Sequence, residues 1–326
     1  MKMKFEKPRI VISKCMGFEK CRWNGISINE PAVELLTPYV EYITVCPEME
    51  IGLGAPREPI RLVKKNDKIL LLQSETEKNV TDDMKEFSEK FLDSLEGIDG
   101  FFLKFRSPSC GMANVKVYPS LGKVGAMSNK GKGLFAEKVM EKFPDLPRED
   151  EGRLRNFKIR EHYFTGIFTN ARYRKVKESG RMKDLVKFHS ENKFLLMAYN
   201  QKEMRNLGRI VGNHEKKPFE QVVQEYETHL ANAMARAPRF TTSINVLMHA
   251  LGFFSDDLSA EEKSFFLDSL EQYRAAKVPL SVPVSLIRSW IIRFGEEYLE
   301  SQTFFEPYPS DLVEITDSGK GRTLKK

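Results

Sequence analysis

Cysteine and long apolar runs are both scarce in this chain of 326 residues, which has 4 cysteines and 2 tryptophans. A membrane-spanning helix needs about 20 mostly apolar residues, and no such run occurs, so we expect no membrane span. The chain opens with Met-Lys-Met-Lys and shows no apolar signal segment. So few cysteines in so long a chain also argue against a disulfide framework. The thiols therefore require another explanation.

Three of the cysteines follow predicted β-strands. Cys15 comes after the strand 9–14, Cys46 after the strand 42–45, and Cys110 soon after the strand 101–106. The carboxyl ends of the strands of an open parallel sheet form its ligand crevice, so these thiols are expected to converge there. Any one of them alone would be explained as a small buried hydrophobe. The short sequences around them, Cys-Met-Gly, Cys-Pro-Glu and Ser-Pro-Ser-Cys-Gly, are instead typical of loops.

The spacing of the cysteines separates the possible metal sites. Two close pairs of the kind found in zinc ribbons are absent, and thiolate-rich sites favour zinc or an iron–sulfur cluster. Four thiolates close a site, whereas three leave one position open for substrate, and the residues alone leave the role of Cys21 undecided. Glu48, two residues after Cys46, is placed to act as a general base. Its alternative role is that of a carboxylate at a helix start.

The cysteine motifs together resemble the thiouracil desulfurase family. The resemblance covers roughly residues 8–145 and rests on Ile-Ser-Lys-Cys-Met-Gly with Cys-Arg-Trp-Asn-Gly, on Val-Cys-Pro-Glu with Gly-Leu-Gly-Ala-Pro-Arg, and on Arg-Ser-Pro-Ser-Cys-Gly. It implies an α/β domain that carries a [4Fe-4S] cluster on three cysteines, with one open iron. The ligands implied are Cys15, Cys46 and Cys110, with Cys21 not counted among them. It also implies that Glu48 is the acid/base and that Ser107 assists.

This sequence departs from the family pattern at two places. Lys14-Cys15-Met16 stands where the family often has Ala-Cys-Leu, and Trp23-Asn24-Gly25 stands where it often has Tyr-Asp-Gly. Both departures keep the cysteines and change the walls of the substrate pocket. An oxygen-sensitive cluster and unpaired thiols suit a reducing compartment, so we expect a cytoplasmic location.

The implied chemistry is a hydrolysis without net redox change. An iron that lacks a protein thiolate is a Lewis acid with affinity for the thiocarbonyl sulfur of a substrate. Water activated by Glu48 would attack the carbon, and sulfur would leave as sulfide. Ser107 would hold the pyrimidine or relay a proton, although a serine before proline is also a common turn former.

The hydrophobic pattern predicts two parts. Short apolar runs alternate with helical stretches up to residue 147, which predicts an α/β domain with an open, mostly parallel sheet. The family resemblance implies that the cluster lies at the carboxyl ends of its strands. Residues 148–184 form a basic connecting segment. From residue 185 to 312 apolar residues recur at intervals of three and four, which predicts an all-α domain. Residues 313–326 are polar and predict a disordered tail.

Basic residues are concentrated between residues 101 and 183, where nineteen Lys or Arg face eight Asp or Glu. A charge run is commonly a solvated face, but this one begins at the third cysteine, so a polyanion bound to it would pass near the cluster. Interleaved aromatic residues would stack on unpaired bases or form core at helical spacing. The candidate RNA-binding residues are Lys130, Lys132, Arg153, Arg160, Arg172 and Arg174.

The helical part contains the motifs Phe188-His189, Lys193-Phe194-Leu195-Leu196-Met197-Ala198, Leu207-Gly208-Arg209 and Pro279-Leu280-Ser281-Val282-Pro283. With these motifs it resembles a domain fused behind desulfurase domains, as in tRNA 4-thiouridine desulfidases. The resemblance implies an enzyme that removes sulfur from 4-thiouridine in tRNA, with the helices helping to hold the RNA. One alternative is a desulfurase of free thiopyrimidine bases. A second is a non-catalytic RNA-binding protein with a structural metal site. The sequence gives no indication of the oligomeric state.

Overall fold

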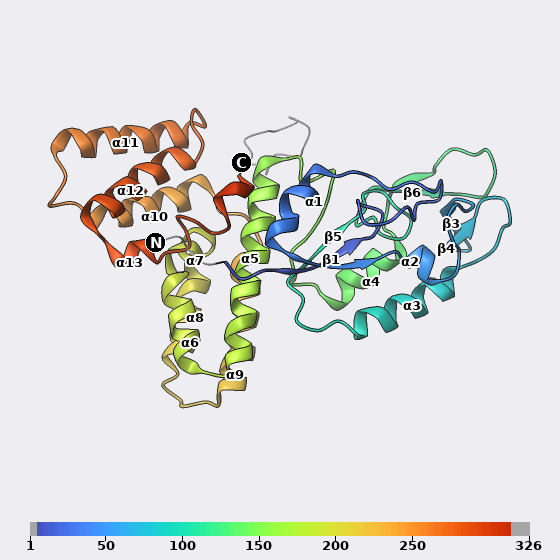
Figure 1. Ribbon diagram of the computed structural model, residues 1–326, viewed down its shortest axis with the longest axis horizontal. Helices are drawn as coiled ribbons and strands as arrows, with labels where there is room; N and C mark the ends of the chain where they lie inside the picture. Colours follow the sequence, from blue (N-terminus) through green and yellow to red (C-terminus); the bar gives the residue numbers. More distant parts are fainter. Residues whose placement is uncertain (1–4, 314–326) are drawn as a thin grey trace. The chain divides into compact units, whose positions relative to one another are not determined.

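The computed structural model describes residues 5–313, and these residues divide into two compact units (Figure 1). One comprises Glu6–Ala171 together with residues 311–313, and the other comprises Arg172–Ser310 with Phe5. The division falls inside helix α5 (Phe157–Ser179). The segment 148–184, predicted to connect two domains, comprises strand β8 (Arg148–Asp150), helix α5 and the start of α6.

A four-stranded parallel sheet forms the centre of the first unit. Its strands are β1 (Arg9–Ser13), β2 (Glu41–Val45), β5 (Gly100–Leu103) and β8, in the order β2-β1-β5-β8. Strand β1 pairs with both β2 and β5, and all pairs are parallel. Residues 10–12 and 101–103 are fully buried, as expected of parallel strands covered on both faces. The carboxyl ends of β2, β1 and β5 therefore meet at one edge.

A second, mixed sheet accompanies it. Its strands are β3 (Ile60–Lys65), β4 (Lys68–Gln73), β6 (Val115–Tyr118) and β7 (Ser128–Gly131), in the order β4-β3-β6-β7. The β3–β4 and β6–β7 pairs are antiparallel, and the β3–β6 pair is parallel. The predicted α/β class and parallel sheet are confirmed. The second sheet was not predicted, because β7 reads Ser-Asn-Lys-Gly and has no apolar alternation.

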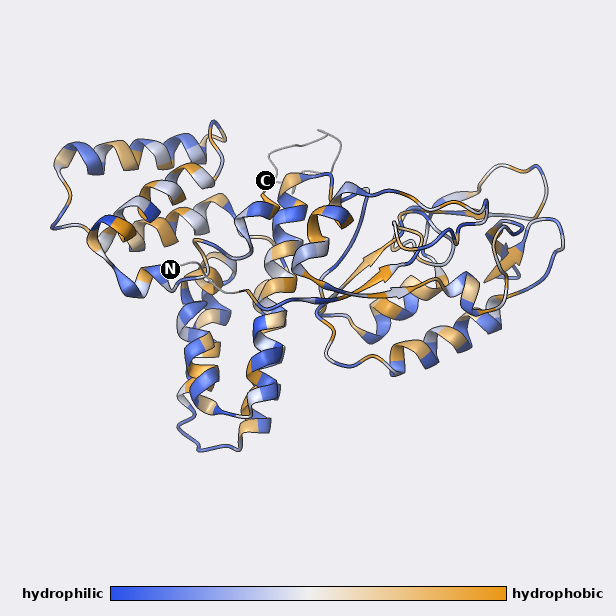
Figure 2. Ribbon diagram, viewed as in Figure 1, coloured by the Kyte–Doolittle hydropathy of each residue, from blue (hydrophilic) through white to orange (hydrophobic). Residues whose placement is uncertain are grey.

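Helices cover the parallel sheet. The shorter ones are α1 (Pro31–Leu36), the 3₁₀ turn η1 (Thr37–Tyr39) and α2 (Pro47–Glu50). The longer α3 (Thr81–Asp93) and α4 (Leu134–Lys142) lie side by side against the sheet (Figure 1). Their apolar sides join the strands in one core that includes Val11, Met84, Phe101, Phe135 and Val139. Figure 2 shows the matching pattern, with apolar colour in the strands and along single sides of these helices.

The second unit is helical, as predicted. Its helices are the end of α5, then α6 (Met182–Glu191), α7 (Lys193–Tyr199), α8 (Gln201–Gly212), α9 (Phe219–Met234), α10 (Phe240–Gly252), α11 (Ala260–Arg274), α12 (Ser281–Phe294) and α13 (Glu297–Glu300). They enclose a core of apolar side chains that includes Tyr226, Leu247, Phe266 and Trp290. Among residues 5–313, no helix is long and apolar enough to cross a membrane. A last 3₁₀ turn, η2 (Ser310–Leu312), follows. The predicted disordered tail, 313–326, lies outside the described residues except for Val313.

Candidate active site with four thiols

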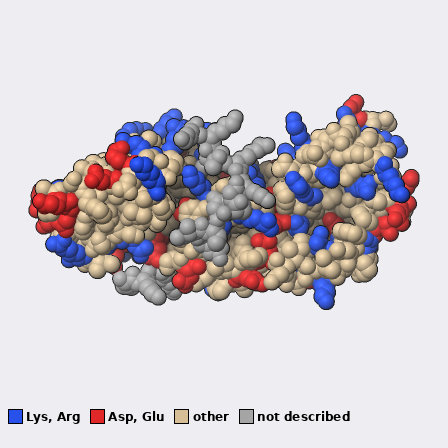
Figure 3. All heavy atoms as spheres, turned by 90° about the horizontal axis from the view of Figure 1, so that it is seen from above, with Lys and Arg blue, Asp and Glu red and all other residues tan. Residues whose placement is uncertain are grey.

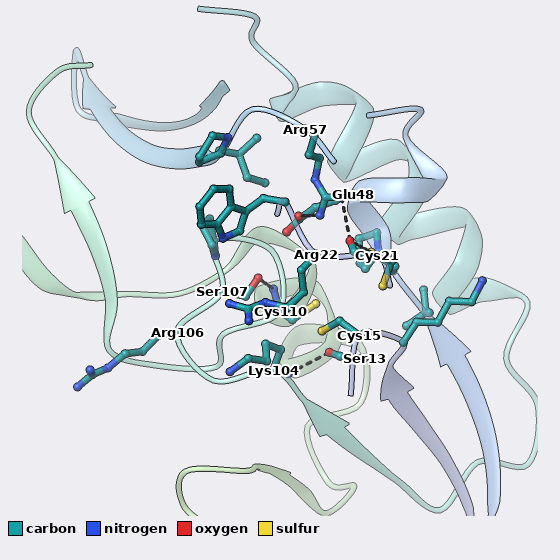
Figure 4. Close-up of a pocket in the computed structure, with 18 of the residues that line it drawn as sticks. Ser13, Cys15, Cys21, Arg22, Glu48, Arg57, Lys104, Arg106, Ser107 and Cys110 are labelled. Atoms are coloured by element: carbon teal, nitrogen blue, oxygen red, sulfur yellow. Dashed lines mark hydrogen bonds and ion pairs between the residues drawn. The ribbon is translucent and has the colours of Figure 1, made fainter. Parts of the chain in front are cut away.

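The pairing of the strands brings the cysteines together. Cys15 lies two residues after β1, Cys46 directly follows β2 as the residue before α2, and Cys110 lies in the loop after β5. Because β1 pairs with both β2 and β5, the three segments leave the sheet at the same edge. All three cysteines and Cys21 line one cavity of about 270 Å³, shown in Figure 4. Glu48 and Ser107 line the same cavity.

The surroundings of Cys21, Cys46 and Cys110 raise the pKa values of these three thiols. A hydrogen bond between the side chains of Cys15 and Cys21 raises the pKa of Cys21 to about 11. A hydrogen bond with Cys21 raises the pKa of Cys46, and burial raises that of Cys110. These three thiols are therefore protonated at neutral pH in the metal-free protein. A metal that binds them as thiolates must displace their protons.

The donor set contains the thiol groups that iron–sulfur clusters use as ligands. Within residues 5–313, no group of three or more His, Cys, Asp and Glu side chains has an arrangement that could hold one metal ion. A tetrahedral zinc ion needs its sulfur ligands at about 2.3 Å. A polynuclear cluster holds its cysteines further apart, because each thiolate binds a different iron. Four thiols around one cavity have the chemistry that iron–sulfur clusters require.

The carboxylate of Glu48 is held from both sides. Glu48 is the second residue of α2, and its Oε2 atom forms an ion pair with Nη2 of Arg57. Its Oε1 atom accepts a 2.6 Å hydrogen bond from the hydroxyl of Ser109. The Ser109 side chain is fully buried and the Arg57 side chain is 3% exposed. Both donors are therefore fixed, and they fix the orientation of the carboxylate.

Arg57 also connects the loops around the thiols. Its Nη1 atom donates hydrogen bonds to the carbonyl of Cys21 at 2.8 Å and to that of Gly54 at 2.6 Å. Its Nε atom is buried and has no partner among the described residues. A cysteine loop and the candidate base thus share one guanidinium. This role could not be predicted from the sequence, because nothing in the motif Gly-Leu-Gly-Ala-Pro-Arg distinguishes Arg57 from a surface arginine.

The two serines before Cys110 have different contacts. The Ser107 oxygen accepts hydrogen bonds from the backbone N–H groups of Ser109 and Cys110, both at 3.2 Å. Ser107 thus shapes the loop that carries the thiol, which is the turn-forming role considered for it. The hydroxyl that contacts Glu48 belongs to Ser109. In Ser-Pro-Ser-Cys, sequence alone gives no signal that selects one serine over the other.

The start of α4 fixes this loop. The N–H groups of Gly133, Leu134 and Ala136 donate to the carbonyls of Gly111, Pro108 and Ser109 at 2.7, 3.1 and 3.0 Å. The first N–H groups of a helix have no partner inside the helix, and here the loop carbonyls supply those partners. A Cβ atom at Gly133 would overlap the Ser109 carbonyl. The cysteine loop and the helix therefore depend on each other.

The candidate RNA-binding residues are not alike in exposure. Lys130 and Lys132 are exposed, and Arg153 is paired with Glu149 at 2.7 Å. Arg160 and Arg174 are buried, and Arg174 pairs with Glu178.

Arg172 is also held within the protein. Its Nη2 atom donates a hydrogen bond to the side chain of Asn192, and burial lowers the pKa of Arg172 to about 10. The surface charge of this segment is therefore smaller than its composition indicates. In the right-hand half of Figure 3, separate basic side chains stand on the surface of the α/β unit.

The chain matches two family models. Residues 10–151 match the model described as 2-thiouracil desulfurase, which confirms the resemblance expected from the cysteine motifs. Residues 193–309 match the model described as a protein of unknown function, DUF1722. The first match contains every residue of the cavity. The second lies within the helical unit.

Individual proteins are also similar to this chain. Uncharacterized protein YbgA of Escherichia coli (strain K12) is 25% identical over 155 residues, which are 47% of this chain and 91% of that protein. Uncharacterized protein YbbK of Bacillus subtilis (strain 168) is 27% identical over 111 residues, which are 31% of this chain and 72% of that protein. A solved structure described as the [4Fe-4S]-dependent thiouracil desulfidase TudS is 24% identical, with a TM-score of 0.35, over 45% of this chain and 93% of that one.

Proposed function

We propose that this chain is an iron–sulfur-dependent desulfidase that converts 4-thiouridine in tRNA to uridine and releases the sulfur as sulfide. The observation that carries the proposal is the Glu48 carboxylate, held by Arg57 and Ser109, in a cavity lined by four thiols. A carboxylate fixed beside thiols suits hydrolysis at a sulfur-bearing carbon. The match of residues 10–151 to the 2-thiouracil desulfurase family supports the same reaction class.

Cys15, Cys46 and Cys110 are the proposed ligands of a [4Fe-4S] cluster. These are the thiols at the ends of three neighbouring strands. Such a cluster, with one iron free of protein ligands, supplies a Lewis acid with affinity for sulfur. Cys21 is left out of the ligand set, because it lies further along the loop between β1 and α1 and not at the end of a strand of the parallel sheet.

The protein groups supply the acid–base chemistry. Glu48 takes a proton from the water whose oxygen replaces sulfur on the pyrimidine carbon. Arg57 and Ser109 keep both oxygens of the carboxylate in place, which lowers the cost of orienting it during the reaction. A carbon–sulfur bond breaks, a carbon–oxygen bond forms, and sulfur leaves as hydrogen sulfide. No electrons are transferred. Ser107 maintains the Cys110 loop and assists at the site.

Two features support tRNA as the substrate. The described cations of the α/β unit include the exposed Lys130 and Lys132, and a separate helical unit follows it. One observation favours a second candidate, a desulfurase of free thiopyrimidine bases: the match to the desulfurase family already contains the whole cavity. We propose a cytoplasmic location, because free thiols and an iron–sulfur cluster suit a reducing compartment.

The deciding experiment uses full-length protein reconstituted with iron and sulfide without oxygen. It is incubated with 4-thiouridine-containing tRNA, and the near-ultraviolet absorbance of the thiolated base is followed together with sulfide release. Free 2-thiouracil and 4-thiouracil are run in parallel. We expect loss of absorbance on tRNA, and no loss with Glu48→Gln protein that retains its iron. Loss on free bases alone would support the second candidate. No loss on any substrate, with iron present, would support a structural metal site in an RNA-binding protein.

A further inference from the structure

The loop that carries Cys15 and Cys21 exposes three large apolar side chains, one of which lines the cavity. Phe18, Trp23 and Ile26 are 41%, 48% and 46% exposed, and all lie in the segment between β1 and α1. Trp23 also lines the cavity. Phe18 contacts the ring of Tyr42, whereas Trp23 has no aromatic neighbour among residues 5–313. An exposed indole at the entrance of a cavity is available for stacking.

The charges at the cavity are almost all of one sign. Of the charged residues that line it, Glu48 is acidic and five are basic: Lys14, Arg22, Arg57, Lys104 and Arg106. Three of the five are neutralised, since Lys14 pairs with Glu19, Arg57 with Glu48, and Lys104 with Glu151. Arg22 and Arg106 have no acidic partner in the described part of the chain. These two guanidinium groups are free to bind an anion.

The two arginines point in different directions. Figure 4 shows Arg22 extending into the cavity and Arg106 extending away from it. Arg106 has a positive φ of 56° and stacks its guanidinium over the Phe105 ring at 4.6 Å from the centroid. Arg22 precedes Trp23 in the chain, and its side chain is half-buried. One cation therefore extends into the cavity that Trp23 lines, and the other extends away from it (Figure 4).

We propose that Trp23, Arg22 and Arg106 form a binding site for single-stranded RNA on either side of the nucleotide that enters the cavity. Trp23 stacks on the base next to the thiolated one, because every base offers a face to an aromatic ring. Arg22 binds the phosphate of the entering nucleotide, and Arg106 binds a phosphate further along the strand. This inference rests on the proposed function and names the groups that separate an RNA substrate from a free base.

The arrangement favours RNA over a second copy of this chain. Two copies that covered their apolar side chains against each other across this entrance would bring Arg22 and Arg106 of both copies together. Like charges brought together in this way repel each other. A strand of RNA offers bases to the indole and phosphates to the arginines at once.

The test compares Trp23→Ala and Arg106→Ala with Arg61→Ala in the reconstituted full-length protein. Arg61 is a matched control, because its guanidinium stacks over the Tyr118 ring at 4.8 Å and it does not line the cavity. We measure the Kd for a single-stranded oligonucleotide that contains one 4-thiouridine, the dependence of Kd on salt, and kcat/KM on that RNA and on free 4-thiouracil. Iron content and thermal midpoint are recorded for each variant.

We expect each of the two variants to weaken RNA binding about tenfold or more, and the ratio of kcat/KM on RNA to that on the free base to fall by a similar factor. The salt slope should decrease by about one with Arg106→Ala, and Arg61→Ala should leave it unchanged. RNA should also quench tryptophan fluorescence, and Trp23→Phe should remove most of that quenching, since Trp290 is buried.

Three results would overturn the inference. The first is that Trp23→Ala and Arg106→Ala behave like Arg61→Ala while the wild type acts on RNA, which leaves the proposed function standing. The second is that the wild type does not bind the oligonucleotide. The third is that the wild type dimerises, and that Trp23→Ala abolishes the dimer without changing the Kd for the oligonucleotide. Binding of RNA at these residues without turnover would instead reject the proposed function and retain the site.

Discussion

The hydroxyl of Ser109 donates a 2.6 Å hydrogen bond to the Oε1 atom of Glu48. Arg57 binds the other carboxylate oxygen, so both oxygens have a protein donor that is itself buried. Ser109 comes from the loop after β5, and Glu48 comes from the helix after β2. The candidate base is therefore oriented by two parts of the chain that reach it from different sides.

Replacing Ser109 with alanine should slow turnover without loss of iron. A hydrogen bond to a charged group contributes about 1.5–3 kcal/mol, which corresponds to a decrease in kcat of roughly tenfold to a hundredfold if the orientation of Glu48 depends on it. The measurement is kcat per bound cluster. Ser107→Ala is the comparison, because its oxygen binds the backbone of the Cys110 loop and its loss should reduce iron content first. A Ser109→Ala protein with normal kcat per cluster would reject the role of Ser109.

Replacing Arg57 with alanine should destabilise the α/β unit. Removal of one partner of a buried ion pair costs about 3–5 kcal/mol, and Arg57 also anchors the carbonyls of Cys21 and Gly54. The matched control is Arg9→Ala, whose pair with Glu41 is exposed and should contribute at most about 1 kcal/mol. Urea denaturation of both proteins measures the difference. Equal midpoints would show that Arg57 is not an anchor.

Replacing Gly133 with alanine should weaken retention of the cluster. The new methyl group would overlap the backbone of Ser109, and backbone cannot rotate away as a flexible side chain can. We expect the Ser107–Cys110 loop to shift, with at least a several-fold loss of iron after reconstitution. Gly125→Ala is the control in the same unit, since a Cβ there meets open space. Similar iron content in both variants would contradict the close packing of the loop against α4.

Because its burial disfavours the protonated form, His189 should make the folded helical unit less stable as the pH falls. Burial, and then the charge of Lys193, lower the pKa of His189 to about 4, whereas the unfolded chain titrates near 6.5. The unfolded state therefore binds the proton first. Stability is complete above pH 6.5 and decreases as the pH falls from 6.5 towards 4, by no more than about 3 kcal/mol.

His189→Gln should flatten that decrease relative to the wild type. The readout is the urea midpoint reported by Trp290 in a Trp23→Phe background, measured for both proteins from about pH 4 to about pH 7.5, so that the range includes both pKa values. His249→Gln serves as the control, because His249 is exposed. The same pH dependence in His189→Gln and the wild type would reject this assignment.

The number of thiolate ligands can be tested at Cys21. Cys21→Ala should keep most of the iron, while Cys15→Ala, Cys46→Ala and Cys110→Ala should each lose most of it. Cys21 is buried, so its replacement is also expected to cost stability, and iron is therefore measured per folded protein. Loss of the cluster from Cys21→Ala at normal folding would show that four thiolates are used.

The position of the cysteines could be predicted because it follows from strand order. Strands 9–14, 42–45 and 101–106 are apolar runs that end at loops, and parallel pairing brings their ends together. Which serine reaches Glu48 depended on the path of the loop between β5 and β6. That path is set by contacts with α4, which begins more than twenty residues later in the chain.

The charge of the surface could not be predicted from the number of basic residues in the sequence, because some of these residues are buried. Arg160 and Arg174 contribute to the basic segment in the sequence, yet they are buried on α5. The aromatic residues interleaved with them, such as Tyr163 and Phe168, belong to the core as well. Arg106 belongs to the basic segment 101–183 but nothing in the sequence distinguished it there, and Arg22 lies outside that segment. Only the folded cavity shows that neither has an acidic partner among residues 5–313.

Cys46 and Glu48 share a single turn of helix, since Cys46 directly precedes α2 and Glu48 is its second residue. The spacing between the backbone of a proposed cluster ligand and that of the proposed base is therefore set within this turn, whereas Arg57 and Ser109 set the direction of the carboxylate. A shift of this turn as a whole would therefore move the proposed ligand and the proposed base together.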